Sequence, residues 1–233
     1  MDILIIDQCS NKKSYPDESP VFAAPAIDEA GLEALCNRND AVCLPARKLY
    51  DGRQQRYIDE AVDSLRSNEN SVDRYFISAG FGLVEEDDAL PPYDVTFAEM
   101  TASEIDSRAT SLEITECAID LLTSNSYDIV FFALGNDYYR ALDLSEVLPM
   151  LSEKTLGVTF NQENLADQHK NVISIPARTE QAKEHGSIVV ALKGTYLKNV
   201  AGNLATGTEV ESLDDVRSAC LSEPTSQKDL TEF

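Results

Sequence analysis

The chain is poor in basic residues. It has 19 lysine and arginine residues against 41 aspartate and glutamate residues, and its formal net charge is −22. An acidic excess repels phosphates and argues against non-specific nucleic-acid binding. The same composition is also typical of proteins from salt-rich cytoplasms, where salt screens the repulsion between surface carboxylates. We favour this halophilic interpretation, in which the protein comes from a haloarchaeon or a halophilic virus. The net charge would then be an adaptation to salt and would say little about binding partners.

Long apolar runs and metal-site spacings are also missing. No run approaches the roughly 20 residues that span a membrane, and the first residues, Met1 to Asp7, are too acidic for a signal peptide. The five cysteines are odd in number and none is spaced Cys-x-x-Cys, so we expect no zinc site and no disulfide. His169 and His185 lack partners at ligand spacing. We therefore expect a reduced, cytoplasmic protein without a metal.

No cofactor signature is present either. The segment Lys193-Gly194-Thr195-Tyr196 lacks the glycines of a phosphate-binding loop, although it can place a lysine at a helix start. We expect no bound cofactor. The sequence shows no internal repeat.

Apolar runs alternate with helical patterns along most of the chain. Strands are predicted at 2–6, 41–44, 74–78, 128–134 and 172–175, and helices at 28–36, 53–65, 101–122, from 137, at 144–151 and at 179–184. The segment 187–192 fits either. This alternation predicts an α/β fold, with residues 1–208 as a single domain whose mostly parallel sheet is flanked by helices. Residues 209–233 are acidic and polar, which predicts a C-terminal helix with a flexible tail, or disorder.

The most informative segment follows the predicted strand 74–78. That strand ends at small residues, Ser78-Ala79-Gly80, followed by Phe81 and Gly82. In an open α/β sheet, ligands bind beyond the carboxyl ends of the strands. We expect Ser78, Gly80 and Gly82 to form a pocket floor, because small residues let a ligand approach the backbone.

Polar residues follow the other predicted strands too. They are Cys9, Ser10, Lys12 and Lys13 after the first, Arg47, Lys48 and Tyr50 after the second, and Gly135 to Tyr139 after the fourth. Strand ends of a parallel sheet lie along one edge, so these loops are expected to converge. Nine of the 19 basic residues lie within the first 74, which indicates an anion site held by Lys12 and Arg47. Arg53, Arg56 and Arg66 fit a solvated helix face better.

Cys9 is the candidate nucleophile. Two nearby lysines can lower the pKa of its thiol, and a thiolate attacks electrophilic carbon. The alternative is a small buried hydrophobe at a strand end, which is the more common role of a free cysteine and the one that the sequence alone favours. Cys36, Cys43 and Cys117 lie in apolar patterns and are expected in the core.

Tyrosines supply the other candidate contacts. Tyr50, Tyr93 and Tyr138 can each stack on a base and donate a hydrogen bond, although either Tyr138 or Tyr139 is expected to be structural. Asp94 can orient a ligand amine or act as a base, or it can belong to the turn after Pro91-Pro92.

Four motifs occur in a fixed order within about the first 100 residues. They are Cys9-Ser10-x-Lys12-Lys13, Pro45-Ala46-Arg47-Lys48-Leu49-Tyr50-x-Gly52, Phe76 to Val84, and Pro92-Tyr93-Asp94-x-Thr96, with Gly135-x-x-Tyr138 as a later feature. This order resembles a family of uncharacterised bacterial, archaeal and phage domains. Their pattern joins Cys-x-x-Lys, Ala-Arg-x-Leu-Tyr, Leu-Ser-Ala-x-x-Gly-Leu and Pro-Tyr-Asp. That family is similar to the peroxide-stress YaaA family and, distantly, to archaeosine synthases, whose Cys-Ser-x-x-Lys-x-Tyr segment resembles Cys9 to Tyr15.

The resemblance implies a YaaA-like fold and base chemistry. YaaA-like proteins bind DNA, one relative converts the nitrile of a 7-deazaguanine base to an amide, and archaeosine synthases handle the same nitrile. The implied protein modifies such a base in DNA or tRNA, by nitrile hydrolysis or glycosylase-like chemistry. Cys9 and Asp94 would then be catalytic, and Ser10, Lys12, Arg47, Tyr50, Tyr93, Gly135 and Tyr138 would contact the substrate.

Two alternatives remain open on the sequence. One is a non-catalytic DNA- or nucleotide-binding protein of stress response or antiviral defence. The other is a halophilic accessory protein whose loops are purely structural.

Overall fold

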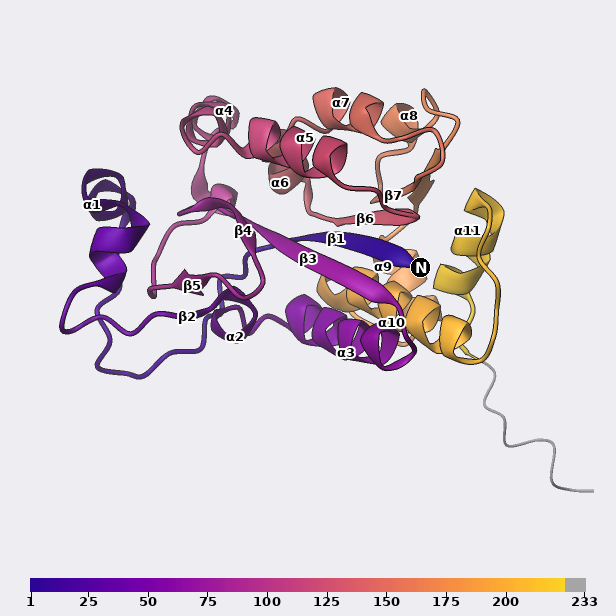
Figure 1. The fold of residues 1–233 in the computed structure, drawn as a ribbon, viewed down its shortest axis with the longest axis horizontal. Helices are drawn as coiled ribbons and strands as arrows, with labels where there is room; N and C mark the ends of the chain where they lie inside the picture. The colour runs from indigo at the N-terminus through magenta and orange to yellow at the C-terminus, as the bar shows by residue number, and fades with distance from the viewer. Residues whose placement is uncertain (225–233) are drawn as a thin grey trace, which may run out of the picture.

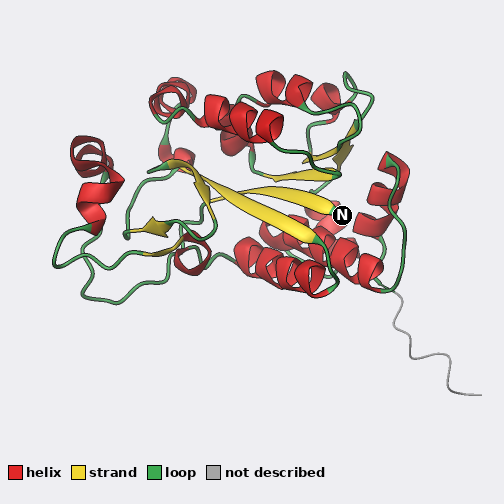
Figure 2. Ribbon diagram, viewed as in Figure 1, coloured by secondary structure: helices red, strands yellow, loops and turns green. Residues whose placement is uncertain are grey.

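A six-stranded sheet forms the centre of the molecule, with helices on both faces (Figures 1 and 2). The computed structural model describes residues 1–224 of the chain. The strand order is β4-β3-β1-β6-β7-β8, and every neighbouring pair is parallel except β3 and β4. The strands are β1 (Asp2–Gln8), β3 (Ser71–Ser78), β4 (Gly82–Glu85), β6 (Ile129–Ala133), β7 (Leu156–Phe160) and β8 (Val172–Ile175). The predicted α/β class with a mostly parallel sheet is confirmed.

Eleven α-helices surround the sheet in the described part of the chain. They are α1 (Ala24–Cys36), α2 (Ala46–Leu49), α3 (Arg53–Ser67), α4 (Ala102–Ser111), α5 (Ile114–Ser124), α6 (Asn136–Leu142), α7 (Leu144–Val147), α8 (Glu163–Ala166), α9 (Thr179–Glu184), α10 (Leu192–Ala205) and α11 (Leu213–Leu221). None of these helices is long and apolar enough to cross a membrane.

Alternation along β1 divides the apolar core into two layers. Leu4 and Ile6 face the layer that contains α4 to α7, whereas Ile3 and Ile5 face α3, α10 and α11 on the opposite side (Figure 1). All four side chains are fully buried. The near-continuous apolar sequence of β1 follows from this burial on both faces, which is typical of parallel sheets.

The strand order places a topological switch point between β1 and β6. From β1 the chain continues to β3 on one side, and from β6 it continues to β7 on the other. Such a point opens a crevice beyond the carboxyl ends of the two strands, where ligands of α/β proteins bind. Here the side chain of Gln8 bridges the two ends, because its Oε1 accepts a hydrogen bond of 2.6 Å from the backbone N–H of Gly135.

Several predicted elements are confirmed with small shifts of their ends. The predicted strands at 2–6, 74–78, 128–134 and 172–175 are β1, β3, β6 and β8, and the predicted helices at 53–65 and 179–184 are α3 and α9. The capping box at the start of α4 is also present, since Thr101 and Glu104 each accept a hydrogen bond from the other's backbone N–H.

Two predicted elements are wrong. The segment 41–44 adds no strand to the central sheet, and only β2 (Leu44–Pro45) pairs, antiparallel, with β5 (Ala89–Leu90). Pro45 lacks the N–H that a longer ladder needs. The predicted helix 101–122 breaks between α4 and α5, because Glu113 adopts a left-handed conformation with φ of 52°.

The C-terminal region contains one described helix. α11 packs against α10, where the side chain of Asn199 donates a hydrogen bond of 2.9 Å to the backbone oxygen of Cys220. The tail expected at the end of 209–233 includes residues 225–233, which lie outside the described residues. The segment 187–192 is a 3-10 turn at Val189–Ala191 that leads into α10.

The cysteine expectations need correction. Cys36 at the end of α1 forms a disulfide with Cys43, whose Cα lies 5.8 Å away, although no disulfide was expected. The chain reverses between the two residues, which brings together cysteines that no Cys-x-x-Cys spacing reveals. Cys36 and Cys43 are partly exposed and Cys117 is exposed, so none of the three lies in the core.

Candidate functional site

Cys9 lies at the carboxyl end of β1 and is almost fully buried, with 2% of its surface exposed. Its backbone N–H donates to the carbonyl oxygen of Ile77 at 3.0 Å, which extends the β1–β3 pairing by one residue. Its Sγ lies 3.0 Å from the hydroxyl of Tyr138, which comes from α6. Residues on the two sides of the switch point are therefore in direct contact through a thiol and a phenol.

A chain of hydroxyl groups lies close to Cys9. The Ser78 Oγ accepts hydrogen bonds from the backbone N–H groups of Gly80 and Phe81, at 3.2 and 3.1 Å. Both lone pairs are then used, so the Ser78 proton is left to donate to the Tyr93 hydroxyl at 2.8 Å. Tyr93 in turn donates to the Tyr50 hydroxyl at 2.7 Å. The bonds run in one direction and leave the Tyr50 proton as the free end of the chain.

We call Cys9, Tyr50, Ser78, Tyr93 and Tyr138 the Cys9 cluster. All five are buried, and none exposes more than 5% of its surface. Burial, and secondly the proximity of Cys9, raise the pKa of each of the three tyrosines well above the ordinary value of 10. The phenols consequently stay protonated at neutral pH and act as hydrogen-bond donors.

Lys13 provides a cationic group beside this cluster. Its backbone forms an antiparallel bridge with Tyr50. Its Nζ lies 4.3 Å from the centre of the Tyr93 ring. Burial lowers the pKa of the Lys13 ammonium below its ordinary value of 10.5, while Cys9 and Asp94 oppose this shift. Sequence reasoning chose Lys12 over Lys13. Side chains of neighbouring residues in an extended segment point to opposite sides, and this alternation could have distinguished Lys13 from Lys12.

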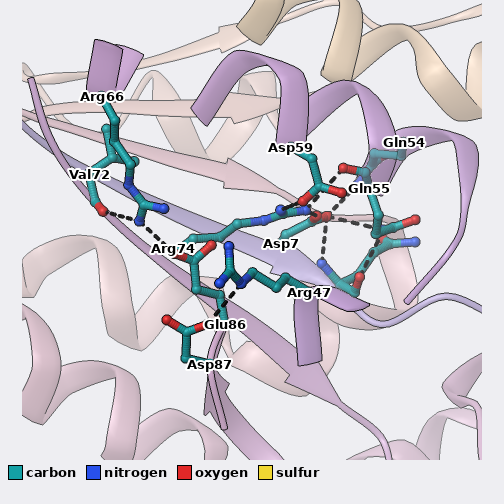
Figure 3. Close-up of polar contacts among 11 residues, drawn as sticks. Asp7, Arg47, Gln54, Gln55, Asp59, Arg66, Val72, Arg74, Glu86 and Asp87 are labelled. Carbon is teal, nitrogen blue, oxygen red and sulfur yellow. Dashed lines mark hydrogen bonds and ion pairs between the residues drawn. The ribbon is translucent and has the colours of Figure 1, made fainter. Parts of the chain in front are cut away.

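Lys12 and Arg47 lie outside the cluster. Lys12 is exposed and pairs with Asp51, and the Arg47 Nε lies 2.8 Å from the Asp87 Oδ1 at the surface (Figure 3). The predicted convergence of basic residues at one anion site does not occur, because most of these side chains pair with carboxylates in different parts of the structure, although Lys12 and Arg56 share Asp51. The other pairs are Arg38–Asp40, Arg56–Asp51, Arg66–Glu86 and Arg74 with Asp7 and Asp59.

The remaining predicted site residues lie around the cluster. Asp94 is exposed and is close enough to Lys13 to affect its pKa. Ser10 is partly buried and donates to the carbonyl oxygen of Lys12, so its hydroxyl serves the loop itself. Gly135 donates its N–H to Gln8, at the centre of the crevice.

The two glycines of the predicted pocket floor serve packing and turn geometry. A Cβ on Gly80 would lie 3.0 Å from the Tyr93 ring, so the backbone sits directly against that side chain. Gly82 has a φ of 79°, which an L-residue rarely adopts, and its Cβ would lie 2.9 Å from the Leu112 carbonyl oxygen. Gly80 therefore favours glycine on steric grounds, and Gly82 on both conformational and steric grounds.

A buried ionic network fixes the end of β1 from the opposite face of the sheet (Figure 3). Asp7 is fully buried, and its Oδ2 accepts a hydrogen bond of 2.8 Å from Arg74. Its Oδ1 accepts from Gln54 at 2.7 Å and from the backbone N–H of Gln8 at 2.8 Å. Because α3 supplies Gln54 and β3 supplies Arg74, this network holds together three elements immediately before Cys9.

Lys193 is a second cation at the switch point. It lies at the start of α10 and its Nζ donates to the carbonyl oxygen of Leu134, directly after β6. Burial lowers the pKa of Lys193 to about 8, against the effect of nearby Asp7. The crevice thus has a buried thiol and phenol on one face and a poorly solvated ammonium on the other.

Comparison with known proteins gives one match. No curated protein and no solved structure matches the chain. A family model, described as a family of unknown function (DUF6884), matches residues 35–166, which is more than half of the chain. The matched region contains β3, β6 and four of the five residues of the Cys9 cluster. The chain therefore belongs to DUF6884, a family of unknown function.

Proposed function

We propose that this protein modifies a 7-deazaguanine-type base in DNA or tRNA, with Cys9 as the nucleophile that attacks an electrophilic carbon of the base. The observation that carries the proposal is the contact of 3.0 Å between the Cys9 Sγ and the Tyr138 hydroxyl. It joins a nucleophile to a proton donor at the switch point of the sheet, where ligands of α/β proteins bind.

With a nitrile substrate, the proposed reaction is the addition of one water to the nitrile through a thioimidate on Cys9. The thiol sulfur forms a bond to the nitrile carbon, and the nitrile nitrogen takes up the proton that leaves the thiol, which gives a thioimidate. Water then adds to the same carbon. The carbon–sulfur bond breaks, the thiol recovers its proton, and the product is an amide that contains one more water than the nitrile.

The surrounding groups suit the proton transfers of this reaction. Lys13 has a lowered pKa, so it can take a proton from the thiol and return it more readily than an ordinary lysine. Tyr138 stays protonated and can donate to the nitrile nitrogen as negative charge develops there. Asp94 lies close enough to Lys13 to stabilise its charged form.

The sequence supports the choice of substrate. The ordered motifs resemble the YaaA family and, through Cys9 to Tyr15, the archaeosine synthases, and relatives of both kinds handle this nitrile. We also propose a halophilic, cytoplasmic protein, which the net charge of −22 supports. The Cys36–Cys43 disulfide would persist in that cytoplasm only if it is not strongly reducing.

A second candidate function is non-catalytic binding of a nucleotide or nucleic acid in stress response or defence. The observation that favours it is the burial of Cys9, which shields the thiol from any substrate unless the cluster opens. This function requires no thiol, so Cys9→Ala would leave binding intact.

Incubation of the folded protein with nitrile-bearing 7-deazaguanine nucleoside, tRNA and DNA, followed by mass spectrometry, tests the proposal. We expect a product that has gained one water, formed by the wild type and by Cys117→Ala but not by Cys9→Ala. Cys117 is the matched control because it is a free thiol on the surface. No product from any of the three substrates would refute the nitrile chemistry, and equal product from Cys9→Ala would remove Cys9 from it.

A further inference from the structure

A cavity of about 540 Å³ lies between α1, the turn after β3 and the end of α4. We propose that this cavity binds the planar ring of a guanine-type base. Its apolar walls come from Ile27, Leu32, Phe81 and Leu112, and Asp28 adds one carboxylate. The volume lies within the usual range for small-molecule sites, roughly 300–1,000 Å³. None of the lining residues belongs to the Cys9 cluster.

The carboxylate of Asp28, whose side chain is 52% exposed, pairs with the mostly buried guanidinium of Arg108. Arg108 exposes 10% of its side chain, and it donates to the carbonyl oxygens of Ala79 and Gly80 at 2.9 and 3.1 Å. Its third contact is an ion pair with the Asp28 Oδ1. Arg108 therefore connects the turn after β3 to α1 and fixes the carboxylate at the cavity.

The polarity of the cavity selects the ligand. Within residues 1–224, the Asp28 Oδ2 has no hydrogen-bond partner, so it is available to accept from a ligand. Guanine-type bases present a ring N–H beside an amino group, and this pair of donors matches a carboxylate. A phosphate would be repelled by the same group. The apolar walls suit the faces of a flat ring.

Gly31 leaves room for that ring. Gly31 interrupts α1 with a φ of 74°. A Cβ at this position would meet no atom within 4 Å, so no side chain fills the space where α1 borders the cavity. Gly80 also borders the cavity, and a Cβ there would meet the Tyr93 ring at 3.0 Å. Figure 1 shows α1 at the edge of the molecule, beyond the carboxyl ends of β1 and β3.

Phe81 links the cavity to the Cys9 cluster. Its ring packs edge-on against Tyr93 with 5.2 Å between the ring centres, and Tyr93 bonds to Tyr50 and Ser78. A base in the cavity is therefore not in contact with Cys9, so the cavity would hold a second, neighbouring base of the substrate and not the base that Cys9 attacks. The inference rests on the proposed function for its choice of a purine, but binding itself requires no thiol.

Calorimetric titration of the full chain with guanosine, in buffer of high salt, tests the inference. We expect saturable binding that Asp28→Asn weakens roughly tenfold, because one charged acceptor is lost. Leu32→Trp, which fills the cavity, is expected to abolish binding. Glu29→Gln is the matched control: it removes the same charge from an exposed position of the same helix, outside the cavity, and should bind like the wild type.

Absence of saturable guanosine binding by the folded wild type would overturn the inference, as would equal effects of Asp28→Asn and Glu29→Gln. If Leu32→Trp fails to fold by circular dichroism, this last comparison decides alone. The two proposals fail separately. Guanosine binding that depends on Asp28, without conversion of any nitrile substrate, would refute the chemistry only. Conversion that neither cavity variant affects would refute the cavity as the binding site.

Discussion

Arg74→Met is expected to destabilise the protein strongly, because Arg74 belongs to the buried network beneath the Cys9 cluster. The guanidinium is fully buried between Asp7, which is also fully buried, and Asp59, whose side chain is 37% exposed. It also lies over the ring of Phe76, with 4.4 Å from its Cζ to the ring centre. Methionine preserves much of the apolar stem but removes every donor.

The loss of stability depends on which hydrogen bonds Asp7 keeps after Arg74 is replaced. Removal of one partner from a buried ion pair typically costs about 3–5 kcal/mol. Asp7 would keep the hydrogen bonds from Gln54 and from the backbone N–H of Gln8, which compensate part of its charge. We therefore expect a loss near the lower end, about 3 kcal/mol in the free energy of unfolding.

Urea unfolding followed by circular dichroism, at fixed high salt, measures this loss. Arg38→Met is the control, since it removes the same kind of side chain from an exposed pair with Asp40. High salt weakens exposed pairs much more than buried ones, so the difference between the variants should persist in it. If Arg74→Met lowers the unfolding midpoint no more than Arg38→Met, the network does not hold the end of β1.

Three further predictions concern other parts of the structure. The double substitution Cys36→Ser with Cys43→Ser should lower the free energy of unfolding by about 2.5 kcal/mol, from the chain entropy of the short closed loop, and an unchanged urea midpoint would contradict this role. Ser78→Ala should cost about 1–3 kcal/mol in the same assay, because two backbone N–H groups and Tyr93 lose their partner, and a loss below this range would count against the directed chain. Lys193 should titrate by NMR near pH 8; since its pKa is about 10.5 when unfolded, its contribution to stability should rise from about pH 8 to 10.5, and Lys193→Met should remove that rise.

The strands that could be predicted are those whose apolar runs are unbroken. β6 and the centre of β1, residues 3–6, are continuous apolar runs, and their burial on both faces explains why the sequence reveals them. β7 escaped prediction because Gly157 and Thr159 interrupt its run, although Gly157 is required there by the close approach of Leu151 and Val172. α10 contains Gly194 and Gly202, which weaken the helical pattern while letting neighbouring segments pack closely.

The meeting of Cys9, Ser78 and Tyr138 could be anticipated because parallel strands end at one edge of a sheet. The charges could not be assigned in the same way. Arg47 was predicted to hold phosphate, but Asp87, forty residues further along the chain, takes up its charge. Partners of this kind depend on tertiary contacts that local patterns do not encode.

The mass of the intact protein during incubation with a nitrile-bearing 7-deazaguanine shows directly whether Cys9 is the nucleophile. We expect that acid quenching during turnover traps a covalent adduct of one base per chain, located on Cys9 by peptide mapping and absent from Cys9→Ala. Cys117→Ala should form the adduct like the wild type, because that thiol is exposed and does not belong to the cluster. A Cys9 that stays unmodified at every quench time while the folded protein forms amide would contradict the assignment of Cys9 as the nucleophile.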